Sequence, residues 1–197
     1  MSGYLKVNKL PGVSHESLYQ YLYADKRAGG TLHTALRYQK ARRKRYGDWE
    51  GDLVIGASQQ QALVTLNERK SRYTLIGKVD RKTAQAVSDT MISLLRHFAD
   101  CVHTLTTDNG KEFAQHERIA TSLDTRFFFA HPCCSWERGA NENMNGLIRQ
   151  FFPKKMAFDN ISFRDIVLAM RSLYHRPRKC LNFKTPHEVF MKQLHSQ

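Results

Sequence analysis

Residues 49–56 read Trp49-Glu50-Gly51-Asp52-Leu53-Val54-Ile55-Gly56, and this stretch sets the start of the fold. Its apolar and β-favouring residues predict a strand that contains Asp52. Two more strands are predicted at 62–66 and 73–79, and the polar segment 67–71 between them predicts a hairpin turn. The main domain is therefore expected to begin with three consecutive strands.

Helices and short strands alternate after this hairpin, and further helices follow them. The predicted elements are, in order, a helix at 83–98 capped by Thr83, a strand at 102–107, a helix at 113–123, a buried strand at 124–130 with the core run Phe127-Phe128-Phe129, a loop at 131–140, a helix at 141–152 that Pro153 ends, and helices beginning near Ser162 and Thr185. This order predicts an α/β fold, with one mixed sheet flanked by helices and a helical C-terminal tail.

The chain is strongly basic. Its 31 Lys and Arg residues against 18 Asp and Glu residues give a net charge of +13 and a pI of about 9.8. Such a charge favours a polyanionic partner, with nucleic acid first and an anionic membrane surface second. Residues 26–45 contain eight Lys or Arg and no acid, which suits either a solvated linker or an arm along DNA phosphates.

No segment resembles a signal peptide, and no apolar run approaches the roughly 20 residues that span a bilayer. We therefore expect a cytoplasmic protein without a membrane partner. The 4 cysteines include no CxxC pair, so we expect reduced thiols rather than a structural zinc site.

Two acids lie where an α/β sheet usually binds a ligand. Asp52 lies in the first strand and Asp108 at the C-terminal tip of the fourth, so the two meet if these strands are neighbours. Glu137 in a loop and Glu142 on the next helix compete as a third acid. Glu142 shares the polar side of that helix with Asn145, opposite an apolar stripe of Met144, Leu147, Ile148 and Phe151. A helix holds a ligand more rigidly than a loop, so Glu142 is preferred.

Three gathered carboxylates suit divalent-metal chemistry on phosphodiesters. Two ions roughly 3.5–4 Å apart can stabilise both the attacking and the leaving oxygen, and Mg²⁺ prefers carboxylate and water oxygens. Each acid also has an ordinary structural explanation. Asp52 could pair with an arginine, Asp108 could close a turn before Gly110, and Glu142 could favour its helix N-terminus. The residues alone leave these explanations open.

Three longer motifs contain the acids. They are Trp49-Glu50-Gly51-Asp52-Leu53-Val54, Thr107-Asp108-Asn109-Gly110-Lys111-Glu112-Phe113 and Ser135-Trp136-Glu137-Arg138-Gly139-Ala140-Asn141-Glu142-Asn143. Their order, and the 33 residues (109–141) between the second and third acids, resemble the DDE transposases of bacterial insertion sequences, most closely the family numbered thirty. The resemblance covers essentially the whole chain and is strongest over 46–195.

The resemblance implies a ribonuclease H-like fold, shared with the catalytic cores of retroviral integrases. It implies DNA cleavage and strand transfer that depend on Mg²⁺, for which Mn²⁺ can substitute. Asp52, Asp108 and Glu142 are then both the catalytic residues and the metal ligands. The expected partners are DNA, as transposon ends and target, and further copies of the chain in a homodimer or larger assembly.

Basic residues at the end of the N-terminal arm, and basic and polar side chains near the acids, are predicted to bind DNA. They are Arg42, Arg43, Lys44, Arg45, Lys111, Arg138, Asn145, Arg149, Lys154 and Lys155.

Members of this family usually carry helix-turn-helix segments ahead of the catalytic core. Residues 1–45, with a short predicted helix at 13–23 and a break at Gly29-Gly30, are therefore interpreted as a remnant of that region and a basic linker, and residues 46–197 as the core. This suggests a fragment, a truncated gene or a separately encoded piece. Two alternatives stay open, a plain nuclease of the same fold and a truncated, non-catalytic DNA-binding remnant.

Overall fold

The computed structural model describes residues 17, 20–21, 24–25, 27–31, 45–57, 59–130 and 139–195, with only the backbone described at 139, 140 and 142. The chain divides into two compact units, Met1–Arg42 and Arg43–Gln197. In the first unit, every described residue from Ser17 to Arg27 is helical, which agrees with the helix predicted there. Gly29, with a φ of 84°, lies in the turn that follows.

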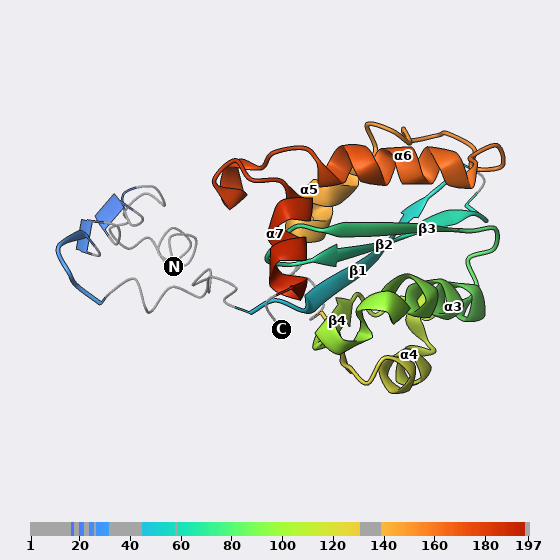
Figure 1. The fold of residues 1–197 in the computed structure, drawn as a ribbon, viewed down its shortest axis with the longest axis horizontal. Coiled ribbons are helices and arrows are strands. Elements are labelled where there is room, and N and C mark those ends of the chain that lie inside the picture. The colour runs from blue at the N-terminus through green and yellow to red at the C-terminus, as the bar shows by residue number, and fades with distance from the viewer. Residues whose placement is uncertain are drawn as a thin grey trace, which may run out of the picture. The chain divides into compact units, whose positions relative to one another are not determined.

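The second unit is built on a five-stranded mixed sheet (Figure 1). The strands lie in the order β3-β2-β1-β4-β5. β1 pairs antiparallel with β2, β2 pairs antiparallel with β3, and β4 and β5 continue the sheet in parallel from β1. Their bounds are β1 Asp48–Ile55, β2 Ala62–Glu68, β3 Thr74–Val79, β4 Thr104–Thr107 and β5 Arg126–Phe129. The predicted hairpin and the mixed sheet are both confirmed.

Helices cover both faces of the sheet, with α3 and α4 on one side and α5 and α6 on the other (Figure 1). The helices are α3 Ala84–Leu95, α4 His116–Ser122, α5 Gly139–Ile148, α6 Phe163–Tyr174 and α7 Pro186–Leu194, with 3₁₀ turns at Arg96–Cys101, Lys111–Phe113 and Lys179–Leu181. Thr83, Ser162 and Thr185 cap α3, α6 and α7 through their side chains, as predicted. No helix in the described part of the chain is long and apolar enough to span a membrane.

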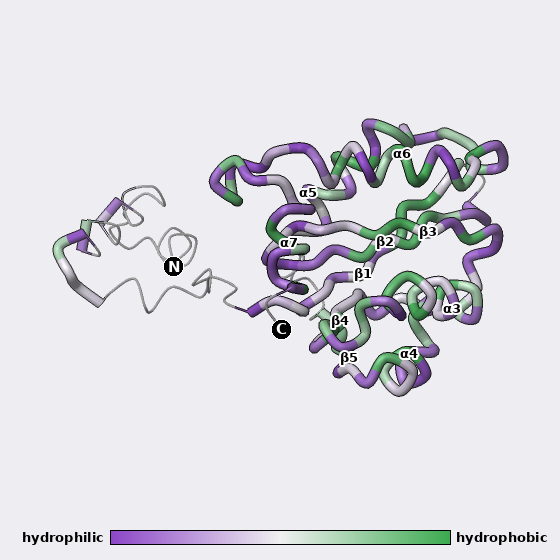
Figure 2. Tube along the Cα trace, in the orientation of Figure 1, coloured by the Kyte–Doolittle hydropathy of each residue, from purple (hydrophilic) through white to green (hydrophobic). Residues whose placement is uncertain are grey.

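Buried apolar side chains form one cluster on each face of the sheet. The cluster beneath α3 includes Trp49, Leu66 and Met91, while the cluster beneath α5 and α6 includes Val54 and Ile148. Figure 2 shows hydrophobic segments along β2 and β3, between the two helical layers. Strand side chains alternate between faces, so every second residue of the inner strands joins the same cluster.

Gly51 brings β1, β4 and α3 close together beside Asp52. A Cβ atom at this position would lie 3.0 Å from Cγ2 of Thr107 and 3.1 Å from Cε of Met91. Both distances are tighter than ordinary contacts, so a side chain at position 51 would require Thr107 or Met91 to shift by a few tenths of an ångström.

Three predicted boundaries were wrong. Asn67 and Glu68 belong to β2 instead of the hairpin turn, because Glu68 is buried and its carboxylate accepts hydrogen bonds from the backbone of Lys70 and Ser71. α5 ends at Ile148, four residues before the predicted end. The chain tightens there into i−3 hydrogen bonds, such as the 3.0 Å bond from the Phe151 amide to the Ile148 carbonyl. The helix predicted at 113–123 is divided into a 3₁₀ turn and α4.

The predicted burial of β5 was also wrong. β5 is an edge strand, and the side chains of Phe128 and Phe129 are 47% and 36% exposed. Only Phe127 packs against the core, as a partly buried side chain. Of the predicted loop at 131–140, the last two residues begin α5, and residues 131–138 lie outside the described residues.

Candidate active site

The pairing of β1 with β4 relates the positions of the first two acids. Asp48, Trp49 and Glu50 pair in parallel with Thr104, Leu105 and Thr106, a constant offset of 56 residues (104 − 48 = 56). Asp52 and Asp108 have the same offset (108 − 52 = 56), but the paired register ends at Glu50 and Thr106, and Asp108 directly follows the last residue of β4, Thr107. Neighbouring strands lie about 4.8 Å apart. The condition that the sequence left open, that these strands be neighbours, is met.

The side chain of Asp52 faces the side of the sheet that carries α5. A Cβ atom at Gly51, the residue before Asp52, would meet Met91 of α3, and side chains alternate between the two faces. Asn145 of α5 confirms this direction, since its Nδ2 atom donates a 2.7 Å hydrogen bond to Oδ2 of Asp52.

Side chains of α5 contact β1 at three positions, each one helical turn after the last. Asn141 donates to the carbonyl of Gly51 (3.4 Å), Asn145 donates to the side chain of Asp52, and Arg149 just beyond the helix donates to the carbonyl of Ile55 (2.9 Å). The predicted apolar stripe packs into the core through Met144 and Ile148, which are 2% and 0% exposed. Phe151, predicted in the same stripe, lies beyond the helix and is exposed. α5 therefore lies along β1 with its polar side facing Asp52.

Each placed acid also makes a local hydrogen bond. Oδ1 of Asp52 accepts from the amide of Leu53 (2.9 Å), and Oδ1 of Asp108 accepts from the amide of Gly110 (3.1 Å). The bond from Gly110 closes the turn that the sequence offered as an ordinary structural reason for an aspartate at position 108. The turn also fixes that carboxylate at the strand tip, so it is compatible with a ligand site.

Glu142 is part of α5, but its side chain lies outside the described residues. Among the side chains that are described, no three or more His, Cys, Asp or Glu residues gather as a metal-binding group. Asp52 lies in β1 and Asp108 directly follows the neighbouring strand β4, whereas Glu142 is placed by its backbone alone.

The donors present around Asp52 and Asp108 fit a hard cation. They are carboxylate oxygens, which Mg²⁺ prefers. Oδ1 of Asn145 is buried without a hydrogen-bond partner. This oxygen beside Asp52 is free to accept a hydrogen bond from one of the water molecules that Mg²⁺ usually retains as ligands.

A further carboxylate lies on the same face of β1, two residues before Asp52. Glu50 is fully buried, and its Oε1 atom lies 2.8 Å from Nε of Arg69. The guanidinium compensates this charge, so Glu50 adds less repulsion to the acid pair than a bare carboxylate would. This buried ion pair was not predicted from the sequence.

The predicted DNA-binding side chains have different surroundings. Arg45 is half-exposed and pairs with Asp48 at 2.5 Å. Lys111, Lys154 and Lys155 are exposed. Arg149 is instead used inside the protein, where burial lowers its pKa and its guanidinium donates to carbonyl oxygens. Arg42, Arg43, Lys44 and Arg138, and the competing acid Glu137, lie outside the described residues.

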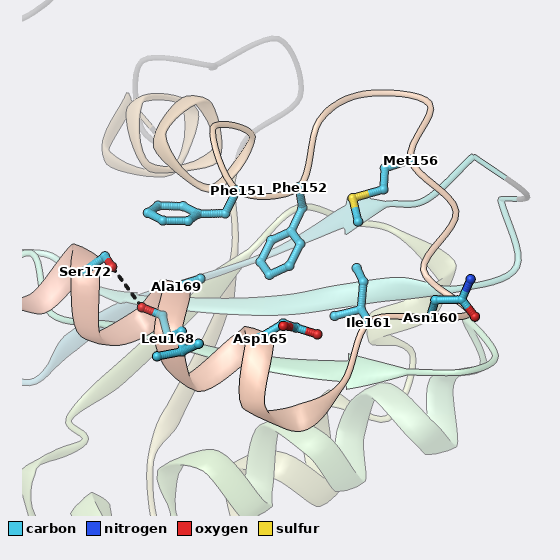
Figure 3. Close-up of a pocket in the computed structure, with 9 residues that line it drawn as sticks. All are labelled: Phe151, Phe152, Met156, Asn160, Ile161, Asp165, Leu168, Ala169 and Ser172. Carbon is cyan, nitrogen blue, oxygen red and sulfur yellow. Dashed lines mark hydrogen bonds between the residues drawn. The ribbon is translucent and has the colours of Figure 1, made fainter.

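An apolar hollow between α6 and the segment after α5 is separate from the acids (Figure 3). Phe151, Phe152 and Met156 point into it from one side and α6 forms the other. Its lining residues are Phe151, Phe152, Met156, Asn160, Ile161, Asp165, Leu168, Ala169 and Ser172. Neither Asp52 nor Asp108 lines it, so the hollow is not the candidate metal site.

Solved structures with the same fold define the class of this domain. The catalytic core domain of BIV integrase superposes with a TM-score of 0.61 at 20% identity, over 76% of this chain and 97% of that one. The HTLV-2 integrase catalytic core domain superposes with a TM-score of 0.57 at 16% identity, over 74% and 96%. The domain therefore has the ribonuclease H-like fold of integrase catalytic cores, as predicted.

Sequence comparisons agree with this class. Residues 42–133 match the family model for the integrase core domain. The transposase for insertion sequence element IS4351 of Bacteroides fragilis is 39% identical over 214 residues, covering 94% of this chain and 65% of that protein. Transposase InsI for insertion sequence element IS30A of Escherichia coli (strain K12) is 42% identical over 151 residues, covering 75% and 38%. Residues 42–133 are therefore similar to integrase core domains and most of the chain is similar to insertion-sequence transposases, although the chain spans less than two thirds of the length of either relative.

Proposed function

We propose that this chain carries the catalytic core of a transposase that cuts DNA strands and joins them to a target with the help of Mg²⁺, or of Mn²⁺ in its place. The observation that carries the proposal is the parallel pairing of β1, which contains Asp52, with β4, which Asp108 directly follows, together with the hydrogen bond from Asn145 of α5 to Asp52. The similarity to insertion-sequence transposases supports DNA as the substrate.

In this proposal Asp52, Asp108 and Glu142 hold the metal ions. Asp52 lies in β1 and Asp108 directly follows the adjacent strand β4, and position 142 of α5 lies one turn before Asn145, which contacts Asp52. Bound Mg²⁺ would lower the pKa of an attacking water and stabilise charge on the leaving oxygen. Asn145 holds one oxygen of Asp52, and the turn at Gly110 holds one oxygen of Asp108. The chain thus fixes the direction of both carboxylates before a metal arrives.

DNA binding is proposed to use the basic surface near these acids. Lys111 follows Asp108 by three residues and is exposed, and Lys154 and Lys155 are exposed beyond α5. Lysine ammonium groups bind phosphates as point charges, so they would position the backbone without selecting a sequence. Strand transfer acts on two DNA ends, so we also propose a dimer or larger assembly on DNA.

The experiment offers pre-cut DNA ends and an acceptor duplex to the wild-type chain and to Asp52→Asn, Asp108→Asn and Glu142→Gln. Joined product that requires Mg²⁺ is expected from the wild type only. DNA affinity, measured separately in each variant, should stay close to that of the wild type because phosphate contacts dominate it. Asp80→Asn is the matched control, since its side chain is 82% exposed and the same charge is lost.

The outcomes separate the three functions. Cleavage without joining would assign a plain nuclease. Salt-sensitive DNA binding without any reaction in Mg²⁺ or Mn²⁺ would assign a non-catalytic DNA-binding chain. Full activity in Asp52→Asn or Asp108→Asn would refute the proposed site itself.

A further inference from the structure

A row of hydrogen bonds runs beneath the first turn of α5, across four elements of the fold. The Thr74 hydroxyl of β3 donates to Oδ1 of Asn67 on β2 at 2.7 Å. Nδ2 of Asn67 donates to Oδ1 of Asn141 on α5 at 2.7 Å. Nδ2 of Asn141 in turn donates to the backbone carbonyl of Gly51 on β1 at 3.4 Å. The row therefore connects the β2–β3 hairpin to the helix and the helix to the first strand.

The row is buried, and its direction is fixed. Thr74, Asn67 and Asn141 are each 1% exposed. Each amide accepts through its oxygen and donates through its nitrogen. Rotating one amide by 180° would therefore set two donors or two acceptors against each other. Buried amides persist only when such bonds are made, so the row admits one arrangement of these side chains.

Apolar side chains fill most of the remaining contact between α5 and the sheet. Val54, Leu63 and Ile76 lie on the same sheet face and pack with Met144 and Ile148. The polar row occurs at the other end of α5, at its first turn. Hydrophobic packing tolerates small shifts of a helix, whereas directed hydrogen bonds hold it in one position.

The row meets the chain next to two of the three proposed metal ligands. Asn141 immediately precedes Glu142, and Gly51, whose carbonyl it contacts, immediately precedes Asp52. Asn145, one turn later, contacts Asp52 directly. Two anchors one turn apart fix both the position and the rotation of α5 relative to β1.

We propose that Asn141 is a positioning residue, whose buried side chain holds the first turn of α5 against β1 and thereby keeps Glu142 in register with Asp52. The inference rests on the proposed function, because it concerns the same site. Metal ligands must be held within about 0.5 Å of their productive positions, and a misplacement of about 1 Å can lower a rate by roughly 10²-fold.

The test compares Asn141→Asp and Asn141→Ala with the wild type. The aspartate has nearly the same size but cannot donate to the Gly51 carbonyl, and the alanine removes the contact entirely. Strand transfer of pre-cut ends is measured in single turnover, well below the unfolding midpoint of each variant. The rate should fall by about 10- to 100-fold, and the Mg²⁺ concentration for half-maximal rate should rise several-fold, whereas DNA affinity should change little. Thr74→Val, at the far end of the row, should show a smaller loss.

Two control variants separate positioning from general stability. Asn143→Ala removes an exposed amide from the same helix and should leave the rate and the Mg²⁺ requirement unchanged. Val87→Ala creates a cavity in the opposite core, where Val87 is fully buried. Val87→Ala should lower stability without changing the Mg²⁺ requirement. If Asn141 only stabilised the fold, its variants would likewise leave the Mg²⁺ requirement unchanged.

The outcomes also distinguish this inference from the proposed function. A wild-type rate and Mg²⁺ requirement in Asn141→Ala would overturn the positioning role alone. The same conclusion would follow if Val87→Ala reproduced the entire defect. A wild-type chain that shows neither strand transfer nor stabilisation by Mg²⁺ would overturn the proposed function and this inference together.

Discussion

Replacing Asn145 by aspartate would set a second carboxylate against Asp52, because Nδ2 of Asn145 lies 2.7 Å from Oδ2 of that acid. Two unit charges about 4 Å apart repel by about 4 kcal/mol at an effective dielectric constant near 20. Both side chains are half-buried, and solvent screening should reduce this penalty to about 2 kcal/mol. The Asn145→Asp variant should lose about that much unfolding free energy when both groups are ionised.

This penalty requires two charges, so it depends on pH. The repulsion disappears when either carboxyl is protonated, so the stability lost at neutral pH should return in acid. Mg²⁺ between the carboxylates should restore most of the stability at neutral pH.

Urea unfolding near neutral pH and near pH 4, with and without excess Mg²⁺, measures these effects. Asn143→Asp adds the same charge at an exposed position of the same helix and should change stability little. Asn145→Ala removes the hydrogen bond without adding charge, and should cost about 1 kcal/mol at either pH. The reasoning is refuted if Asn145→Asp matches Asn143→Asp at neutral pH, or if neither pH nor Mg²⁺ changes its loss.

Three further predictions concern the fold, and thermal or urea unfolding tests each. Gly51→Ala should cost about 1–3 kcal/mol, because the added methyl group meets Met91 at 3.1 Å; an unchanged midpoint would contradict the close packing. Ile148→Ala, at a fully buried position of α5, should cost about 2–5 kcal/mol, and a loss below 1 kcal/mol would mean that α5 packs loosely. Ser162→Ala should cost about 1 kcal/mol by removing the α6 cap. The hydrogen bonds from Ser162 lower the pKa of Asp165, so the part of the stabilisation that comes from the Asp165 carboxylate holds above the unfolded pKa of 3.8 and is lost as pH falls through the folded pKa, while the bond from the Asp165 amide to the Ser162 hydroxyl remains. A deficit in Ser162→Ala that is no smaller at acid pH would contradict this.

Local chemistry in the sequence was sufficient to place the first two acids. Asp52 lies inside an apolar, β-favouring segment, and Asp108 follows a short strand and begins a turn, so both positions could be predicted from their neighbours. Whether they meet depends on the pairing of β1 with β4. That pairing joins residues 56 apart and is a property of the whole sheet, which no local pattern reports.

The errors have the same physical origin. Asn67 is polar and was assigned to a turn, yet it lies in a strand because its amide hydrogen bonds to Thr74 and Asn141. Hydropathy does not distinguish an exposed polar residue from a buried, hydrogen-bonded one. Phe128 is apolar and was assigned to the core, yet it is exposed because β5 is an edge strand. Position within the sheet decided both cases. Asn141 lies four positions, about one helical turn, before Asn145, and this spacing was the signal from which its role could have been predicted.

Titration with Mn²⁺, detected by its paramagnetism, tests most directly whether Asp52, Asp108 and Glu142 form one metal site. The wild-type chain should bind Mn²⁺, and Asp52→Asn, Asp108→Asn and Glu142→Gln should each weaken binding by at least about tenfold, equivalent to about 1.4 kcal/mol. Asp80→Asn should bind like the wild type. Wild-type affinity in any of the three site variants, above all Glu142→Gln, would contradict the shared site.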